Sequence, residues 1–197
     1  LDHKKRYIVV VAQEDGSVED PKPEDLYAYG TLAQVLKVFD MPDNSKSAIV
    51  QGISRVKILD YIKLEPYFSA AVESMEDKPI TDQLEVDALI SNLRQAFDDL
   101  MKVAPNLTEE HSGMLKNIQK PNRLTDRAIS VITISNQEKQ EILEELDIKK
   151  RIEKALNLIS REIQRIKLGE EIQSEVHDEI TKTQREYYLR EQMKAIK

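Results

Sequence analysis

Residues 147–197 read DIKKRIEKALNLISREIQRIKLGEEIQSEVHDEITKTQREYYLREQMKAIK and contain one glycine and no proline. In the first half of this stretch, apolar residues recur at steps of three and four, at Ile148, Ile152, Ala155, Ile159, Ile163 and Ile166. That spacing keeps one face of a helix apolar. Helix-forming residues continue to Lys197, with no glycine or proline stop signal near the end. We therefore predict one long helix over about 147–197 that leads into further sequence.

The second half of this predicted helix has a thinner apolar face and is expected to project from the globular body. Gly169 interrupts the apolar rhythm, and because glycine weakens a helix interior we predict a hinge there. Four large side chains follow near the end, at Tyr187, Tyr188, Leu189 and Met193. Three of them are consecutive and point to different sides of the helix. One neighbouring helix cannot bury them all, so we predict contacts with other subunits or other domains.

The preceding residues, 79–146, carry helical periodicity broken by prolines. The first helix is predicted to be capped by Thr81 and to end at Val103, ahead of Pro105. The later helix starts are predicted at Thr108, at Asp126 after a stop at Pro121-Asn122, at Ser135 and at Asp147. Ser135 with Glu138 three residues later has the pattern of a capping box.

The first part of the chain, residues 1–78, has the pattern of short strands. Residues 7–12 form a continuous β-branched run, which predicts a strand buried on both faces. Further strands are predicted at 30–39, 48–52 and 68–73, with a turn at 42–45 that pairs the second and third. Gly52 predicts a bulge or corner that lets the sheet curl. The fold class is therefore α+β: a small curled β domain, 1–78, followed by a helical domain, 79–197.

Composition limits the classes of function. A formal net charge of −7 argues against a general nucleic-acid or anionic-membrane binder, because phosphate binding needs a basic surface. The chain has no cysteine, so it has no disulfide or thiolate site, which suits a reducing compartment. No apolar run approaches the ~20 residues that span a bilayer, and no signal-peptide pattern opens the sequence. We expect a cytoplasmic protein with neither a nucleic-acid nor a membrane partner.

The sequence offers no catalytic constellation. The five glycines are each isolated, so none of them forms a phosphate-binding loop. The three histidines lie in unrelated segments, and the consecutive residues His177, Asp178 and Glu179 cannot converge on one metal from a helix. No serine has a nucleophile-elbow context. We predict no catalytic, cofactor-binding or metal-binding residue in this chain.

Four residues are candidate contacts for a protein substrate. Tyr27 and Tyr29 would share one face of a strand and form an aromatic contact patch, with packing at the sheet edge as the alternative. Met101 and Met114 would line an adaptable apolar surface, with core packing as the alternative.

Several segments resemble one family in the family's own order. They are Asp25-Leu26-Tyr27-Ala28-Tyr29-Gly30-Thr31-Leu32-Ala33, Gln51-Gly52-Ile53-Ser54-Arg55-Val56, Leu124-Thr125-Asp126, Glu138 to Glu144, and Gln184 to Ile196, QREYYLREQMKAI. Together they resemble the amino-terminal substrate-recognition region of Lon, the bacterial ATP-dependent serine protease. The resemblance covers nearly the whole chain and is most specific in the last segment. It implies a PUA-like β domain, a helical domain and a long last helix that leads to an ATPase module.

The sequence departs from the family pattern at two places. Family members begin with further strands and a helix before the equivalent of Tyr7, so the resemblance implies a sheet without its first strands. The family's nucleotide-binding loop and Ser–Lys dyad match nothing here, so the chain itself is expected to be inactive in ATP hydrolysis and proteolysis.

The resemblance implies a non-catalytic region that engages unfolded or damaged proteins. The parent protein would be an ATP-dependent serine endopeptidase that uses ATP and Mg²⁺ and works as a cytoplasmic hexamer. Two alternatives stay open: a purely structural oligomerisation or linker module, and a free-standing ligand-binding protein of strands and helices.

Overall fold

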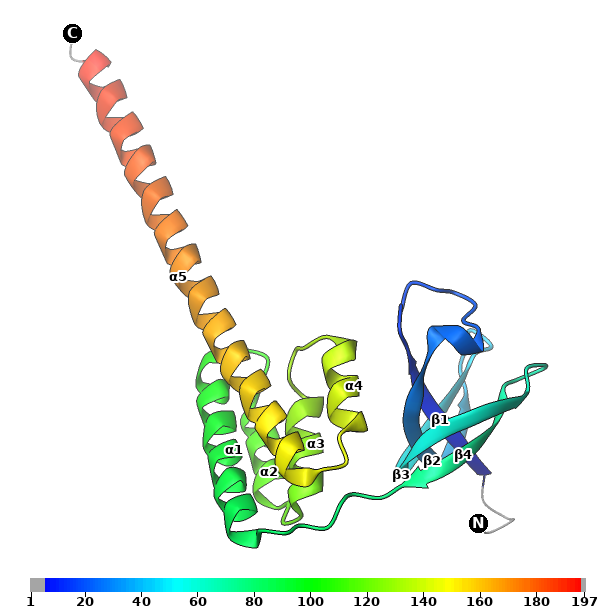
Figure 1. The fold of residues 1–197 in the computed structure, drawn as a ribbon. Helices are drawn as coiled ribbons and strands as arrows, with labels where there is room; N and C mark the ends of the chain where they lie inside the picture. The colour runs from blue at the N-terminus through cyan, green and yellow to red at the C-terminus, as the bar shows by residue number, and fades with distance from the viewer. Residues whose placement is uncertain (1–5, 196–197) are drawn as a thin grey trace.

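The computed structural model describes residues 6–195, and it separates a sheet from a group of helices packed around the foot of one long helix (Figure 1). The far end of that helix stands well away from the body. The elements in chain order are β1 (Arg6–Gln13), a 3₁₀ turn (Pro23–Asp25), β2 (Leu26–Asp40), β3 (Lys46–Lys63), β4 (Ser69–Met75), α1 (Gln83–Val103), α2 (Glu109–Lys116), α3 (Pro121–Ser130), α4 (Asn136–Glu144) and α5 (Ile148–Ala195). The predicted α+β class is confirmed.

The sheet is a four-stranded antiparallel meander in the order β1-β2-β3-β4. The prediction that residues 7–12 are buried on both faces is wrong. In β1, side chains alternate between exposed and half-buried, and Ile8 and Val10 are 41% and 49% exposed. The reason is topology: β1 is an edge strand of an antiparallel sheet, which can leave one face uncovered, whereas the continuous apolar run suggested a covered parallel strand.

Gly52 lies at a bulge, as predicted. Ser54 lies opposite Leu32 and Gly52 opposite Ala33, so Ile53 is an extra residue in β3. Bulges of this kind bend a strand and increase its twist. The predicted turn between β2 and β3 is also present, closed by a hydrogen bond from the Met41 amide to the Ser45 carbonyl oxygen at 2.9 Å.

The main hydrophobic core lies among the helices. The largest contributions come from Leu93, Phe97 and Leu100 of α1, Leu124 and Ala128 of α3, and Ile152, Ala155 and Ile159 of α5, all at most 1% exposed. Apart from Leu124, these residues belong to the apolar faces predicted for α1, α3 and α5; Leu124 precedes Asp126, where the third helix was predicted to begin. Each buried aliphatic or aromatic side chain of this kind contributes about 1.5–3 kcal/mol.

The helix starts agree with the sequence at Thr108, Ser135 and Asp147 and differ at two others. The N-cap of α1 is Asp82, whose carboxylate accepts from the Glu85 amide, and not Thr81. Pro121 does not stop a helix but begins α3, which places Asp126 inside that helix and not at its cap. Proline is favoured at the first helical position because the amide hydrogen it lacks has no partner there.

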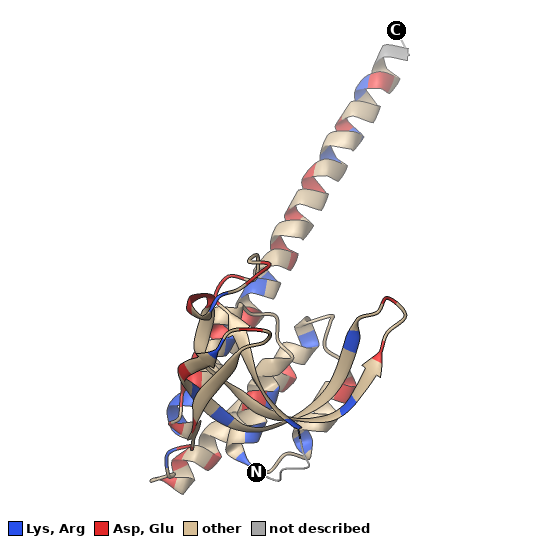
Figure 2. Cartoon of the chain, turned by 90° about the vertical axis from the view of Figure 1, so that its right-hand side faces the viewer, with Lys and Arg blue, Asp and Glu red and all other residues tan. Residues whose placement is uncertain are grey.

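Helix α5 runs from Ile148 to Ala195 without interruption at Gly169. From Lys167 to Met193 every residue is exposed, so only the first part of α5 belongs to the packed body, as predicted. Acidic and basic residues are spread along the projecting part, while charges are sparse over the strands (Figure 2). The division at residues 78 and 79 lies in the segment that joins β4 to α1 and stays a prediction, as does the absence of first strands.

Candidate functional site

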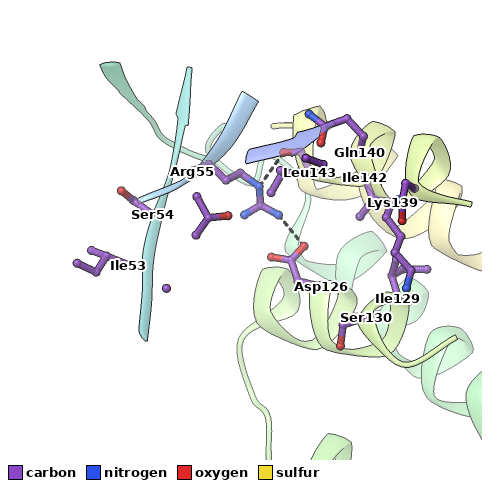
Figure 3. Close-up of a pocket in the computed structure, with 14 residues that line it drawn as sticks. Ile53, Ser54, Arg55, Asp126, Ile129, Ser130, Lys139, Gln140, Ile142 and Leu143 are labelled. Carbon is purple, nitrogen blue, oxygen red and sulfur yellow. Dashed lines mark hydrogen bonds and ion pairs between the residues drawn. The ribbon is translucent and has the colours of Figure 1, made fainter. Parts of the chain in front are cut away.

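A cavity of about 520 Å³ lies between the sheet and the helices α3 and α4. Its sheet wall comes from β1, β2 and the bulged part of β3, and its helical wall comes from α3 and α4 (Figure 3). The lining residues are Ala12, Thr31, Gly52, Ile53, Ser54, Arg55, Asp126, Ile129, Ser130, Asn136, Lys139, Gln140, Ile142 and Leu143. We call this cavity the interdomain cleft.

The sheet wall of the interdomain cleft continues into exposed apolar surface. Ile53 lines the cleft and is 51% exposed. Val10 lies directly opposite Thr31, another lining residue, and Ile8 lies opposite Ala33. Residues directly opposite each other on antiparallel strands project from the same face, so Ile8 and Val10 extend the apolar wall beyond the cleft. This arrangement suits apolar side chains of a second molecule.

Arg55 reaches from β3 toward Asp126 and Leu143 of the helices (Figure 3). Its Nε donates to the Leu143 carbonyl oxygen at 2.9 Å, and its Nη2 donates to Asp126 Oδ1 at 2.6 Å. The Arg55 side chain is only 13% exposed. Because these two bonds use the planar fork of the guanidinium, they fix its direction as well as its distance from the helices.

Gln140 of α4 makes the second polar link between the two parts. It is 5% exposed, and its Nε2 donates to the Tyr29 carbonyl oxygen of β2 at 3.1 Å and to Glu144 Oε1 at 2.8 Å. A buried amide of this kind must find partners, since an unpaired one costs about 1–3 kcal/mol. Gln140 therefore holds α4 against β2 at one side of the cleft.

Asp77 lies in the segment between β4 and α1, with its Oδ1 3.9 Å from Arg55 Nη1. It accepts hydrogen bonds from Arg151 of α5 and from Asn122 Nδ2, the latter at 2.8 Å. Burial by itself raises the pKa of Asp77, but the hydrogen bonds from Arg151 and Asn122 and the charges of Arg151 and Arg55 outweigh it. The pKa of Asp77 is therefore lowered, and its carboxylate stays ionised near neutral pH.

The predicted substrate-contact residues do not gather in one place. Tyr27 and Tyr29 are half-buried on β2, and Tyr29 is two residues from Thr31 of the cleft wall. Met101 is half-buried against the helical core. Met114 is 41% exposed on α2, with its Sδ 3.1 Å from Arg127 Nη2. Their contact with a substrate stays a prediction.

The predicted contact residues of α5 lie far along the projecting helix. Tyr187, Tyr188, Leu189 and Met193 are 68%, 64%, 52% and 69% exposed. A Cβ added at Gly169 would meet no atom within 4 Å, so packing does not require glycine there. The hinge and the inter-subunit contacts both stay predictions.

The sequence reasoning did not find Arg55, Asp126 or Gln140 as site residues. All three lie in segments that carry the family resemblance, and Asp126 is also predicted as a helix cap, but none is predicted as a site residue. In the part of the chain that the structure describes, no three His, Asp or Glu side chains come together as metal ligands. Within the same residues, no helix is both long and apolar enough to cross a bilayer.

The family model of the substrate-binding domain of ATP-dependent protease La (Lon) matches residues 1–161. The chain belongs to the Lon substrate-binding domain family. It is 42% identical over 190 residues to the Lon protease of Koribacter versatilis, with 96% of this chain and 23% of that protein covered. It is 38% identical over 179 residues to the Lon protease of Dictyoglomus thermophilum, with 91% and 22% covered. This Lon domain therefore spans about a quarter of the length of its relatives.

The Lon fold assignment is supported by a solved structure. The amino-terminal domain of a Mycobacterium avium complex Lon protease superposes with a TM-score of 0.56 at 18% identity, over 79% of this chain and 90% of that one. At that identity the likeness concerns the fold alone. The resemblance seen in the sequence is confirmed, and this chain is a Lon substrate-binding region of strands followed by helices.

Proposed function

We propose that this Lon domain holds unfolded segments of other proteins in and beside the interdomain cleft and performs no catalysis itself. The observation that carries the proposal is the apolar wall that leaves the cleft and continues over Ile8, Val10 and Ile53, each at least 41% exposed. Unfolded or damaged proteins expose the apolar side chains that folded proteins bury. An exposed apolar surface of this kind marks an interaction site.

Weak binding suits such a role. A disordered segment loses conformational freedom when it binds, so its affinity for a given contact area is low. Tyr27 and Tyr29 are proposed additional contacts because they lie on the strand that supplies Thr31 to the cleft. Met101 and Met114 are proposed contacts of the helical part, where Met114 is the more accessible.

We propose that the parent protein is an ATP-dependent serine endopeptidase. The support is that its relatives are named Lon proteases and are about four times as long as the matched part. The parent would use ATP and Mg²⁺ and act as a cytoplasmic hexamer that degrades what this domain delivers. Neither a glycine-rich nucleotide loop nor the family's Ser–Lys motif lies within this chain.

Binding to one protein in its folded and unfolded forms tests the proposal. Native α-lactalbumin and the reduced, carboxymethylated form, which cannot fold, are titrated against the chain by fluorescence anisotropy. Binding to the unfolded form alone is expected. Equal binding to both forms, or to neither, would count against substrate recognition.

The matched variants Ile53→Asp and Leu59→Asp test where that binding occurs. Both residues are exposed aliphatic residues of β3, at 51% and 60%, but only Ile53 lines the cleft. Burial of an aliphatic side chain contributes about 1.5–3 kcal/mol, so Ile53→Asp should weaken binding about tenfold or more. Leu59→Asp should leave the affinity unchanged. An equal loss of affinity in both variants would show that the unfolded protein does not bind at the cleft.

A second function, assembly through α5, is favoured by a separate observation. Ile172, Val176 and Ile180 are 52%, 51% and 51% exposed and recur at steps of four, so they form a stripe on the projecting helix. Light scattering of the chain with and without residues 170–197 tests this role. Self-association that disappears in the shorter chain, with substrate binding unchanged, would assign assembly to α5 and recognition to the cleft.

A further inference from the structure

The hydrophobic core of the helices does not extend into the described strands. The core cluster of the helical part, from Val86 to Ile159, includes no described residue of β1 to β4. In the described part of the sheet, the buried hydrophobic residues are Ala33 and Val56. Domains joined without a large hydrophobic interface are expected to move relative to each other. Polar contacts must therefore set the angle between the sheet and the helices.

Four charged residues meet at the junction of the two parts, and we call them the charge cluster: Arg55, Asp77, Asp126 and Arg151. Arg55 Nη2 lies 2.6 Å from Asp126 Oδ1, and its Nη1 lies 3.9 Å from Asp77 Oδ1. Arg151 pairs with Asp77, and its Nη1 lies 3.8 Å from Asp126 Oδ1. Each carboxylate thus faces both guanidinium groups.

The two arginines differ in what they hold. Arg151 is fully buried at the foot of α5, and its Nε donates to the Glu145 carbonyl oxygen at 2.6 Å, so it belongs to the helical body. Arg55 is the member of the charge cluster that comes from the sheet, in β3. If Arg55 is replaced by an uncharged residue, Asp77 and Asp126 keep Arg151 as a partner. The helical body is then expected to stay folded while the sheet loses its charged anchor.

The position of Arg55 also relates the charge cluster to the cleft. Arg55 and Asp126 both line the interdomain cleft, one from each wall (Figure 3). The bond between them therefore joins the two walls of the cleft. The Arg55 side chain is 13% exposed and the Asp126 side chain 37%, so salt should screen this ion pair less than a fully exposed one.

We propose that Arg55 is a releasable latch: its bonds to Asp126 and to the Leu143 carbonyl hold the sheet at a fixed angle to α5 and set the width of the interdomain cleft. With the latch open, the sheet swings relative to the long helix and the cleft changes width. The part of this inference that concerns substrate access rests on the proposed function. The part that concerns the angle between the domains does not.

Distances between two spin labels test the angle. The sequence contains no cysteine, so Gln51→Cys on the sheet and Gln164→Cys on α5, both exposed, give two unique labelling sites. Pulsed electron paramagnetic resonance on the otherwise unchanged chain should give one narrow distance distribution. Arg55→Met should broaden or shift it. A broad distribution in the parent chain, or an unchanged narrow one in Arg55→Met, would overturn the latch.

Two further variants keep this test decisive. Arg161→Met is the matched control, because Arg161 pairs with Glu138 within the helical part, and it should keep the narrow distribution. Amide hydrogen exchange of β2 and β3 shows whether Arg55→Met still has a folded sheet. If the amides of β2 and β3 lose their protection from exchange in Arg55→Met, the distance measurement is made on Arg55→Lys instead. Lysine keeps the charge but lacks the planar fork, so the distribution must broaden for the latch to stand.

A binding measurement separates the latch from the proposed function. Affinity for reduced, carboxymethylated α-lactalbumin should change by at least threefold in Arg55→Met and stay unchanged in Arg161→Met. An unchanged affinity in Arg55→Met would overturn control of the cleft by the latch. Failure of every variant to bind the unfolded protein, with the distances behaving as expected, would overturn the proposed function and leave the latch standing.

Discussion

Gly30 of β2 lies so close to Val10 of β1 that a Cβ atom added to it would be 2.5 Å from the Val10 carbonyl oxygen. Real Cβ atoms do not approach a backbone oxygen so closely, and a strand backbone cannot move aside as a flexible side chain can. Gly30 is therefore constrained by the neighbouring strand and not by a turn.

Replacing Gly30 by alanine should push β1 away from β2. The expected cost is about 1–3 kcal/mol, the range for inserting a methyl group into a well-packed place. Urea unfolding combined with amide exchange of β1 and β2 measures it. Gly16→Ala is the matched control, because a Cβ there meets nothing within 4 Å. Equal stability of the two variants would contradict the close approach.

The capping box of α4 should be measurable as a stability difference. Ser135 Oγ accepts from the Glu138 amide at 3.3 Å, and the Glu138 carboxylate accepts from the Ser135 amide at 2.9 Å. Ser135→Ala should destabilise the chain by about 0.5–2 kcal/mol in thermal or urea unfolding. Ser130→Ala removes only an exposed hydroxyl that donates to the Arg127 carbonyl oxygen and should cost less. The reverse order would show that the cap is not formed.

The carboxyl group of Asp77 should titrate below its ordinary pKa of 3.8. Hydrogen bonds from Arg151 and Asn122 lower its pKa in the folded chain, so folding favours the charged form. The resulting stabilisation is fully present above the unfolded pKa and is lost as the pH falls through the lower folded value. Carbon-detected NMR of the Asp77 carboxyl group checks this. A midpoint at or above 3.8 would contradict the ion pairs around it.

Arg151 and Lys46 should differ greatly in what their ion pairs contribute. Arg151 is fully buried, and Arg151→Met removes the nearer cation from the little-exposed Asp77 carboxylate and leaves Arg55 Nη1 at 3.9 Å, which should cost about 3 kcal/mol. Lys46 pairs with Asp40 at 2.6 Å on the surface, with side chains 70% and 82% exposed. Lys46→Met should cost about 1 kcal/mol or less. Urea unfolding measures the loss in free energy of unfolding for both variants. Similar losses would show that burial does not determine how much these ion pairs stabilise the chain.

The helical part was largely predictable because its information is local. The step of three and four residues among Ile152, Ala155 and Ile159 identified the buried face of α5 directly. The capping pattern of Ser135 needed only four residues. Pro121 was misassigned because proline both stops a helix and begins one, and the residues around it do not settle which.

The sheet and the cleft were less predictable because they depend on contacts far apart in the sequence. Whether Ile8 and Val10 are buried depends on what packs against that face of the sheet. A β-branched run has the same sequence pattern in a strand covered on both faces and in one covered on a single face. Arg55 and Asp126 are separated by 71 residues and leave no periodic trace of their pairing. The sequence held one weaker indication of this pair. Arg55 lies in an otherwise strand-forming segment, and a half-buried arginine there needs a polar partner.

Gly169 gives the sharpest test of how stiff the projecting helix is. Helix α5 passes through it without a break, and a methyl group there would touch no atom within 4 Å. Alanine is more favourable than glycine in a helix interior by about 1 kcal/mol, so Gly169→Ala should slow amide exchange on both sides of residue 169. If Gly169 is a hinge, spin labels placed on either side of it will also show a narrower distance distribution in the variant. Gly113→Ala, another helical glycine with open space around it, should leave α5 unchanged. Identical exchange and identical distances in Gly169→Ala and the parent chain would show that α5 is already rigid at this position.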